Sequence, residues 1–329
     1  MVWQVMMDKK TKKIVILATG GTIAGWAADA NSPENYQAGV LDVGQLLGVA
    51  TPSAHVLVTE QVAQVDSKDM DDNLWRTLLK RCAHWLVQPD VQGLVVTHGT
   101  DTLEETAYFL AAVLRPRQPV VLTCAMRAAN APDADGPKNL QDAIAIAANP
   151  NISGVRVVCA GEVHAGHEIQ KLHSQRLNPF VSMDGGPVGL VKSGQWHCLR
   201  EPTPFKALGD IPTLTDVLAC DPWPRVEMVM SHAGANGAMV HALQANNPPS
   251  GWVIAATGNG TVHRDLQLAL ENVQAKGAMV VRASRCALGG VESRAGDVFR
   301  HAGSLTTVQA RVALLLELIS KNKGRSKAA

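Results

Sequence analysis

Short apolar runs without polar alternation recur along the chain, and stretches of helical periodicity separate them. Four such runs occupy residues 13–19, 93–99, 119–125 and 154–160 and are rich in Val, Ile and Leu. Continuous apolar runs of this length are typical of strands that are buried on both faces of a parallel sheet. The first part of the chain therefore predicts such a sheet.

The segments between these runs carry apolar residues at helical spacing. Residues 71–86 place Leu74 and Leu78 on one stripe and begin with acidic side chains, which favour the N-terminal end of a helix. Residues 102–114 and 137–149 follow the same pattern. We therefore predict helices that connect the strands and cover the sheet.

The alternation returns after a proline-rich stretch of little periodicity at residues 201–224, which we interpret as a linker. Beyond it we expect strands and helices in turn, at residues 225–232, 235–246, 251–260, 262–276, 278–284 and 307–321. The predicted fold class is α/β. It comprises a larger N-terminal catalytic domain at residues 1–200, with a mostly parallel sheet flanked by helices, and a smaller C-terminal α/β domain at residues 225–329.

Charge and hydropathy exclude several classes of partner. Thirty basic and 29 acidic residues give a net charge of +1 without a long block of one sign, which disfavours nucleic acid as a partner. No stretch approaches the roughly 18 apolar residues that a membrane span requires. Residues 1–13 have no apolar core followed by a cleavage site. We expect a cytoplasmic protein, or a periplasmic one if a leader has been removed.

The six cysteines are scattered and form no C-x-x-C pair. Cys124 and Cys159 lie inside apolar runs, where a free thiol behaves as a small apolar side chain. A disulfide framework is therefore disfavoured, and a reducing compartment fits the pattern better.

Three predicted strands end in glycine-flanked hydroxyl residues, at residues 19–22, 97–102 and 257–261. In open parallel sheets, ligands bind outside the carboxyl ends of the strands. Small residues there let backbone N–H groups approach a bound group. These strand ends predict a site for a polar small molecule.

Phosphate and metal sites do not fit the spacing. Gly20 and Gly25 have the separation of a phosphate-binding loop, but Trp and Ala follow instead of Lys and Ser, and no G-x-G-x-x-G follows a strand. His164, His167 and Glu168 stand in the order H-x-x-H-E, which matches no common zinc motif and is explained equally well by a polar loop. We expect no metal and no cofactor.

The threonines at these strand ends leave two interpretations open. Thr22 could cap a helix, as threonine often does. It could also be a nucleophile, in which case a nearby side chain must accept its proton, because a threonine hydroxyl is weakly nucleophilic by itself.

Two motifs favour the second interpretation. The stretches "ILATGGTIAG" (16–25) and "GLVVTHGTDTLEETAYFL" (93–110) resemble the two signature motifs of the bacterial-type L-asparaginases, a family that includes glutaminase-asparaginases. Similarity extends through "AMRAANAPDADGPKNLQDAIAIA", "TGNG" and "ASR". The resemblance implies a large N-terminal and a small C-terminal α/β domain. It also implies hydrolysis of L-asparagine to L-aspartate and ammonia through an acyl-enzyme on threonine.

The resemblance also implies catalytic roles for particular residues. Thr22 matches the nucleophile, and Tyr36 matches a tyrosine on a mobile loop that helps to activate it. Thr100, Asp101 and Lys171 match a second triad, in which a neutral lysine could relay a proton. Which threonine carries the acyl group stays open.

Further residues are implied to bind the substrate. Ser67 matches a serine that holds the substrate carboxylate, and Asp101 can pair with the ammonium. The loops at Gly21 and Gly99 can offer backbone N–H groups to the oxyanion. Lys68 replaces a glutamine common in the high-affinity branch, and we expect it to face solvent. The preference between asparagine and glutamine stays open.

The family completes each site with residues of a neighbouring subunit. Thr261 and Glu292 are the matching positions here, although the alignment slips around Glu292. A homotetramer of intimate dimers is therefore expected. Alternative functions are a glutaminase-asparaginase, another amidase, or a catalytically silent amino-acid sensor on the same fold, which the retained catalytic residues disfavour.

Overall fold

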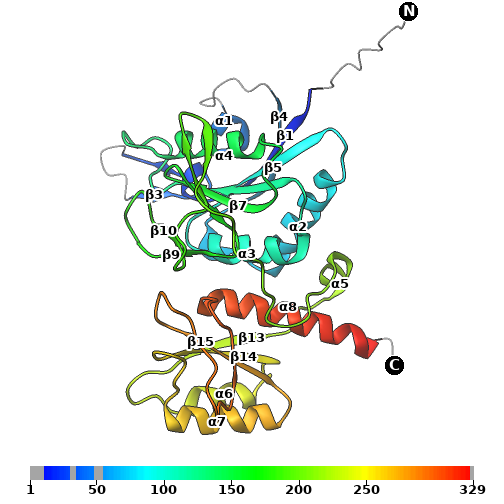
Figure 1. Cartoon of the computed structure of the whole chain (residues 1–329), viewed down its shortest axis with the longest axis vertical. Coiled ribbons are helices and arrows are strands. Elements are labelled where there is room, and N and C mark those ends of the chain that lie inside the picture. Colours follow the sequence, from blue (N-terminus) through cyan, green and yellow to red (C-terminus); the bar gives the residue numbers. More distant parts are fainter. Residues whose placement is uncertain (1–10, 30–34, 48–54, 327–329) are drawn as a thin grey trace, which may run out of the picture.

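A computed structural model of the chain describes residues 11–29, 35–47 and 55–326. The predicted class is confirmed, since a larger N-terminal unit with a mostly parallel sheet stands above a smaller C-terminal α/β unit (Figure 1). Residues 1–10, on which the interpretation of the N-terminal segment rests, lie outside the described residues. Among the residues that are described, no helix has the length and apolar character needed to cross a bilayer.

The N-terminal unit is built on an eight-stranded sheet in the order β12-β11-β8-β7-β6-β5-β1-β4. The five strands from β7 to β4 pair in parallel, and the remaining three add antiparallel pairs at one edge. The strands are β1 (Lys13–Gly20), β4 (Val56–Val65), β5 (Val91–Thr97), β6 (Pro119–Thr123), β7 (Gly154–Cys159), β8 (Glu162–Ala165), β11 (Gly189–Lys192) and β12 (Gln195–Cys198).

The four apolar runs of the sequence form β1, β5, β6 and β7, as predicted. The sequence analysis missed β4 and the antiparallel strands. Strand β4 lies at the edge of the sheet, and its residues are half-buried or exposed, so it lacks a continuous apolar run. The antiparallel strands are only four residues long, which is too short for a clear period.

Alternate residues of β1 point to opposite faces of the sheet and join two separate cores. Val15 and Leu17 pack with α2 (Asp72–Leu86) and α3 (Leu103–Leu114). Ile14 and Ile16 pack with α1 (Val43–Leu47) and α4 (Gly136–Ala147). This burial on both faces explains why the strand shows no polar alternation.

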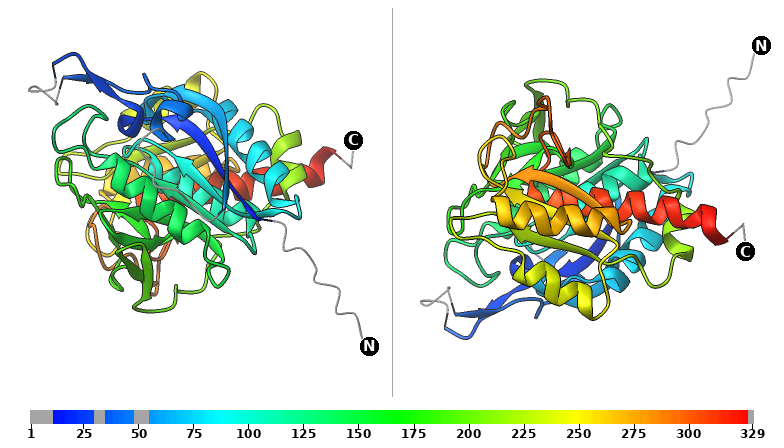
Figure 2. Two further views of the ribbon diagram at one scale, coloured as in Figure 1. Left: turned by 90° about the horizontal axis from the view of Figure 1, so that it is seen from above. Right: turned by 90° about the horizontal axis from the view of Figure 1, so that it is seen from below.

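The C-terminal unit has a parallel four-stranded sheet in the order β13-β14-β15-β16. Helices α6 (Ala238–Ala245) and α7 (Arg264–Ala275) lie on its outer face, and α8 (Thr307–Ser326) lies between the two sheets and contacts α3 (Figures 1 and 2). Its strands are β13 (Val226–Met230), β14 (Gly251–Ala256), β15 (Met279–Ser284) and β16 (Arg300–His301).

The segment at residues 201–224 is not a bare linker, because it contains helix α5 (Leu214–Ala219). The side chains of Thr213 and Asp216 form a capping box at the start of this helix. Trp223 is buried and lies 5.7 Å from Phe109, ring centre to ring centre. A helix of six residues is too short to show periodicity in the sequence.

Strand β1 marks the point where the strand order of the parallel sheet reverses. The chain passes from β1 to β4 on one side, crosses back to β5 on the other side, and continues outward through β6 and β7. The crevice at the carboxyl ends of β1 and β5 is therefore the expected position for a ligand.

Candidate active site

A cleft of about 550 Å³ lies at the carboxyl ends of β1 and β5. It contains all five residues predicted to be catalytic, together with five others; its lining residues are Thr22, Tyr36, Thr100, Asp101, Met126, Arg127, Asp133, Lys171, Ser174 and Gln175. These residues come from strand ends and loops far apart in the sequence. The fold therefore brings together the five side chains for which the resemblance implies catalytic roles.

Close approach of glycine backbones makes this cleft possible. Gly20 and Gly21 have φ angles of 105° and 79°, which glycine adopts without strain. A Cβ atom on Gly21 would lie 2.3 Å from the backbone nitrogen of Gly99. A Cβ atom on Gly99 would lie 2.5 Å from the hydroxyl oxygen of Ser67. The glycines thus let three loops touch, which places their hydroxyl residues side by side.

Thr22 and Tyr36 form the first pair of functional groups in the cleft. Thr22 begins a single 3₁₀ turn (Thr22–Ala24), and only 7% of its surface is exposed. Its hydroxyl oxygen lies 2.7 Å from the hydroxyl oxygen of Tyr36, within hydrogen-bond distance. Tyr36 comes from β3 (Tyr36–Gln37), which pairs with β2 (Trp26–Ala27).

Thr100, Lys171 and Asp101 form the second group. The Lys171 amine donates to the Thr100 hydroxyl at 2.9 Å and to an Asp101 carboxylate oxygen at 2.6 Å. Lys171 ends β9 (Ile169–Lys171), which pairs with β10 (Phe180–Ser182). The Asp101 side chain is 54% exposed and faces the cleft, so it is accessible to a cationic ligand.

Ser67 lies directly behind Asp101. Its side chain is buried, and its hydroxyl oxygen accepts a hydrogen bond from the backbone N–H of Asp101 at 3.2 Å. Ser67 is not among the described residues that line the cleft, so its contact with a substrate carboxylate stays a prediction. The neighbouring Lys68 faces solvent, as expected, and forms an ion pair with Asp69.

A buried histidine supports the loop that carries Thr100. Burial lowers the pKa of His98 to about 4, so its ring is neutral at pH 7. The Trp75 indole N–H donates to Thr106, which leaves the Thr106 hydroxyl to donate to the Nε2 atom of His98. The Nδ1–H of His98 then donates to the Gly99 carbonyl at 2.7 Å. This chain of bonds fixes the loop from inside the protein.

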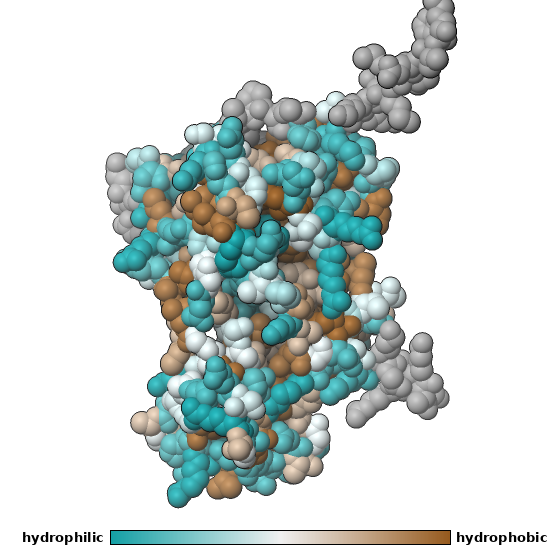
Figure 3. Space-filling view, in the orientation of Figure 1, coloured by the Kyte–Doolittle hydropathy of each residue, from teal (hydrophilic) through white to brown (hydrophobic). Residues whose placement is uncertain are grey.

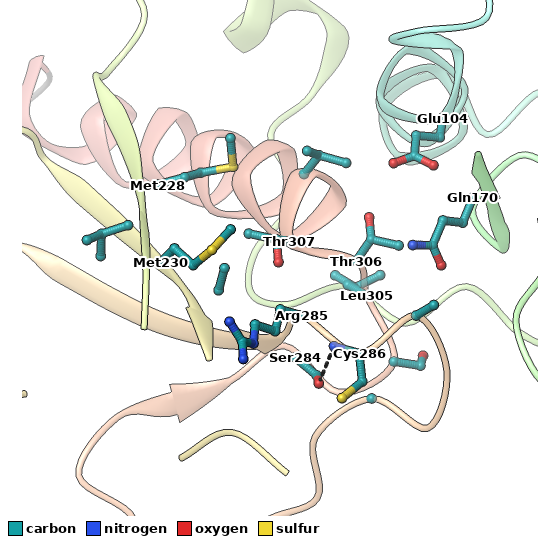
Figure 4. Close-up of a pocket in the computed structure, with 16 residues that line it drawn as sticks. Glu104, Gln170, Met228, Met230, Ser284, Arg285, Cys286, Leu305, Thr306 and Thr307 are labelled. Atoms are coloured by element: carbon teal, nitrogen blue, oxygen red, sulfur yellow. Dashed lines mark hydrogen bonds between the residues drawn. The ribbon is translucent and has the colours of Figure 1, made fainter. Parts of the chain in front are cut away.

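Glu104 connects the cleft with a second cavity of about 400 Å³ between the two units (Figure 4). Its carboxylate accepts a hydrogen bond from the backbone N–H of Lys171 at 2.6 Å and lies on the same side of this cavity as Gln170. Burial raises the pKa of Glu104 to about 7, although the N–H and the charge of Lys171 oppose the shift. The nearby Glu105 carboxylate adds to the increase.

The sequence analysis assigned no role to several lining residues of the cleft. Met126, Arg127 and Asp133 lie in the loop after β6, whose Asp135 carboxylate accepts hydrogen bonds from the backbone N–H groups of Met126 and Arg127. The sequence did contain a signal for these residues, because the β6 strand is followed by a polar loop with Asp and Pro. This loop lies in the stretch "AMRAANAPDADGPKNLQDAIAIA", which contributes to the resemblance.

Thr261 and Glu292 are not among the described residues that line this cleft. The Thr261 hydroxyl lies 2.7 Å from that of Thr257, and the backbone N–H of Glu292 donates to Asn259 at 2.7 Å. Both residues thus belong to loops of the C-terminal unit, and their assignment to a site stays a prediction.

The histidines after β7 have partners within the protein. His164 contacts the Ser182 hydroxyl at 2.8 Å, and His167 donates to the Thr203 carbonyl at 2.9 Å. Glu168 forms an ion pair with Arg200. Within the described ranges, no three His, Cys, Asp or Glu side chains are grouped as a metal site. All six cysteines lie in these ranges and are free thiols.

Comparison with known proteins gives consistent matches along the chain. Residues 13–204 match the family model "Asparaginase, N-terminal", and residues 225–328 match "Glutaminase/Asparaginase C-terminal domain". L-asparaginase 2 of Escherichia coli K12 is 36% identical over 93% of this chain and 88% of its own length. The glutaminase-asparaginase of Pseudomonas fluorescens biotype A is 35% identical over 86% of this chain and 79% of its own length.

Solved structures give the same result. The crystal structure of a probable cytoplasmic L-asparaginase from Campylobacter jejuni superposes with a TM-score of 0.86 and 32% sequence identity. The match covers 94% of this chain and 95% of that chain.

The raised pKa of Glu104 predicts a pH-dependent cost of folding. Between pH 4.5 and pH 7 the carboxyl is ionised in the unfolded chain but protonated in the folded protein, so stability falls as pH rises through this range. We expect Glu104→Gln to remove this cost and to keep an acceptor for the Lys171 N–H. Relative to wild type, the variant should gain up to about 3 kcal/mol between pH 5 and pH 8. Urea unfolding across this range measures the gain, and a pH-independent difference would contradict the interpretation.

Proposed function

Since the chain belongs to the asparaginase family, we propose that it is an amidohydrolase that converts L-asparagine to L-aspartate and ammonia. One observation carries the proposal: a single cleft holds two threonine hydroxyls, and each has its own polar partner at hydrogen-bond distance. A nucleophile with an adjacent proton acceptor is the arrangement that amide hydrolysis through a covalent intermediate requires.

The substrate's charged groups have matching partners in this proposal. The exposed carboxylate of Asp101 binds the ammonium of L-asparagine, and the Ser67 hydroxyl donates to its α-carboxylate. The side-chain amide then lies toward Thr22 and Thr100. The loops at Gly21 and Gly99 surround this position and contribute backbone dipoles to it.

We assign the attack to Thr22. Its oxygen forms a bond to the amide carbon, and its proton passes to the Tyr36 hydroxyl as that hydroxyl gives its own proton to the amide nitrogen, so the C–N bond breaks. With this proton the nitrogen leaves as ammonia, the Tyr36 hydroxyl is restored, and the acyl group stays on the threonine as an ester. Water activated by Thr100, Lys171 and Asp101 attacks the ester, which releases L-aspartate and restores the hydroxyl.

A glutaminase-asparaginase is the second candidate, because relatives of similar identity carry that name. The cleft of about 550 Å³ leaves room for a longer side chain. Relative kcat/KM for L-asparagine, L-glutamine and D-asparagine distinguishes these candidates, and absence of ammonia from all three substrates would favour a sensor.

Thr22→Ala should abolish turnover, because Thr22 carries the acyl group in this proposal. We expect kcat for L-asparagine to fall by about three orders of magnitude or more, measured by coupled ammonia release. Thr77→Ala is the matched control, since Thr77 is exposed on α2, outside the cleft, and its hydroxyl donates to the Asn73 carbonyl. Near-normal ammonia release by a folded Thr22→Ala variant would refute the assignment.

The active assembly in this proposal is a homotetramer of intimate dimers. Thr261 and Glu292 complete the cleft of a neighbouring copy, which agrees with their position outside the described lining of their own cleft. The C-terminal unit also exposes apolar side chains suited to a contact between copies, among them Met228, Met230 and Met239. The face drawn in Figure 3 mixes polar and apolar side chains over both units.

Complementation between two inactive chains tests this assembly. We expect Thr22→Ala and Glu292→Ala to be inactive or strongly impaired alone. When the two variants are co-expressed, a hybrid of one chain of each should recover activity. One of its two sites then combines the native Thr22 of the Glu292→Ala chain with the native Glu292 of the Thr22→Ala chain. A hybrid without recovery, or a fully active monomer in sedimentation analysis, would contradict the shared site.

Localisation stays a prediction. A structural neighbour is described as a probable cytoplasmic L-asparaginase, whereas a relative from Haemophilus influenzae is described as a probable periplasmic L-asparaginase. We propose the cytoplasm, in agreement with the free thiols.

A further inference from the structure

The Asn130 side chain holds the backbone segment against which Tyr36 lies. Asn130 belongs to the loop between β6 and α4. The Ala27 N–H donates to its Oδ1 atom at 2.9 Å, and its Nδ2 atom donates to the Ala27 carbonyl at 2.7 Å. One carboxamide thus satisfies both backbone polar groups of a buried residue, as a neighbouring strand would.

Ala27 is also the residue directly opposite Tyr36 in the pairing of β2 with β3. Each of these strands has two residues, and so small a sheet is marginal by itself. Asn130 extends the sheet on the side away from Tyr36. We propose that Asn130 is a positioning residue, which fixes the Tyr36 hydroxyl against Thr22; the inference rests on the proposed function of that pair.

The loop that carries Asn130 is itself firmly held. The Asp135 carboxylate accepts hydrogen bonds from the backbone N–H groups of Met126 and Arg127 and from the Asn139 side chain on α4. In addition, the Ala129 N–H donates to the Gly25 carbonyl at 2.9 Å. Three hydrogen bonds therefore join this loop to residues 25–27.

Gly25 transmits this support to the Tyr36 ring. A Cβ atom on Gly25 would lie 2.8 Å from the Cδ2 atom of Tyr36, so the ring lies directly against the glycine backbone. The same Cβ would lie 2.9 Å from the Thr22 carbonyl oxygen. Gly25 thus touches both members of the pair, and a displacement of residues 25–27 changes the distance between their hydroxyls.

Removing the carboxamide should lower the rate of the chemical step and leave substrate binding nearly intact. We expect Asn130→Ala to lower kcat about 10- to 100-fold, because small misplacements of catalytic groups cost this much. KM should change by less than about threefold, since the lost interaction acts in the transition state. Asn130→Asp preserves the shape but places a carboxylate oxygen against the Ala27 carbonyl, so it should lower kcat at least as much.

Hydrogen exchange gives a readout that does not depend on activity. The Ala27 amide should exchange faster in Asn130→Ala than in wild type, while peptides from β1 and α3 remain unchanged. Asn149→Ala is the matched control. Asn149 follows the opposite end of α4 and accepts a hydrogen bond from the Asn151 N–H, so this variant should retain kcat.

A double-mutant cycle with Tyr36→Phe decides whether Asn130 acts through the tyrosine. If it does, Asn130→Ala lowers kcat in wild type but by less than about twofold in the Tyr36→Phe background. An equal loss in both backgrounds would overturn the inference and leave the proposed role of Tyr36 intact. If Tyr36→Phe alone retains full kcat, the proposed role of the tyrosine fails, and the inference fails with it.

Discussion

Contact between the backbones of Gly21 and Gly99 is the constraint on which the site depends. The two loops follow neighbouring strands, β1 and β5, and a single methyl group on either glycine would overlap backbone or side-chain atoms of the next loop. Their closeness places Thr22 and Thr100 in one cleft and puts the Ser67 hydroxyl behind them. The glycines of the first motif thus serve close packing of loops, and phosphate binding is not needed to explain them.

The two threonines are supported from different parts of the molecule. The Tyr36 hydroxyl, on the small sheet of β2 and β3, contacts the Thr22 hydroxyl next to the loop after β6. The Lys171 amine, at the end of β9, donates to the Thr100 hydroxyl. Strand β9 is fixed in turn by α8, since the buried Gln309 side chain donates to the Ile169 carbonyl at 2.8 Å. The C-terminal unit therefore supports the second group of the site, even though none of its residues is among those described as lining the cleft. Hydrogen bonds at Ile169 and Lys171 thus join β9 to α8 and to Glu104 on α3.

The sequence was most informative where burial is complete. Strands such as β1 and β5 are buried on both faces, so their apolar runs predict both the sheet and the strand ends that carry the threonines. Edge strand β4 and helix α5 were missed, because partial burial and short length remove the periodic signal. Side chains that act through the backbone, such as Asn130, have no sequence signal, since their partners are the N–H and C=O groups present at almost every residue. The division of the chain at residues 200 and 225 stays a prediction.

The position of a bound product tests the central claim most directly, namely that these loops form one site for an amino acid with a side-chain carbonyl. In a crystal structure with L-aspartate, we expect the ammonium to contact Asp101 and the α-carboxylate to contact Ser67. The side-chain carboxylate should lie within hydrogen-bond distance of both Thr22 and Thr100. L-Aspartate bound in the cavity beside Glu104 and Ser284, with the cleft at Thr22 empty, would contradict the account.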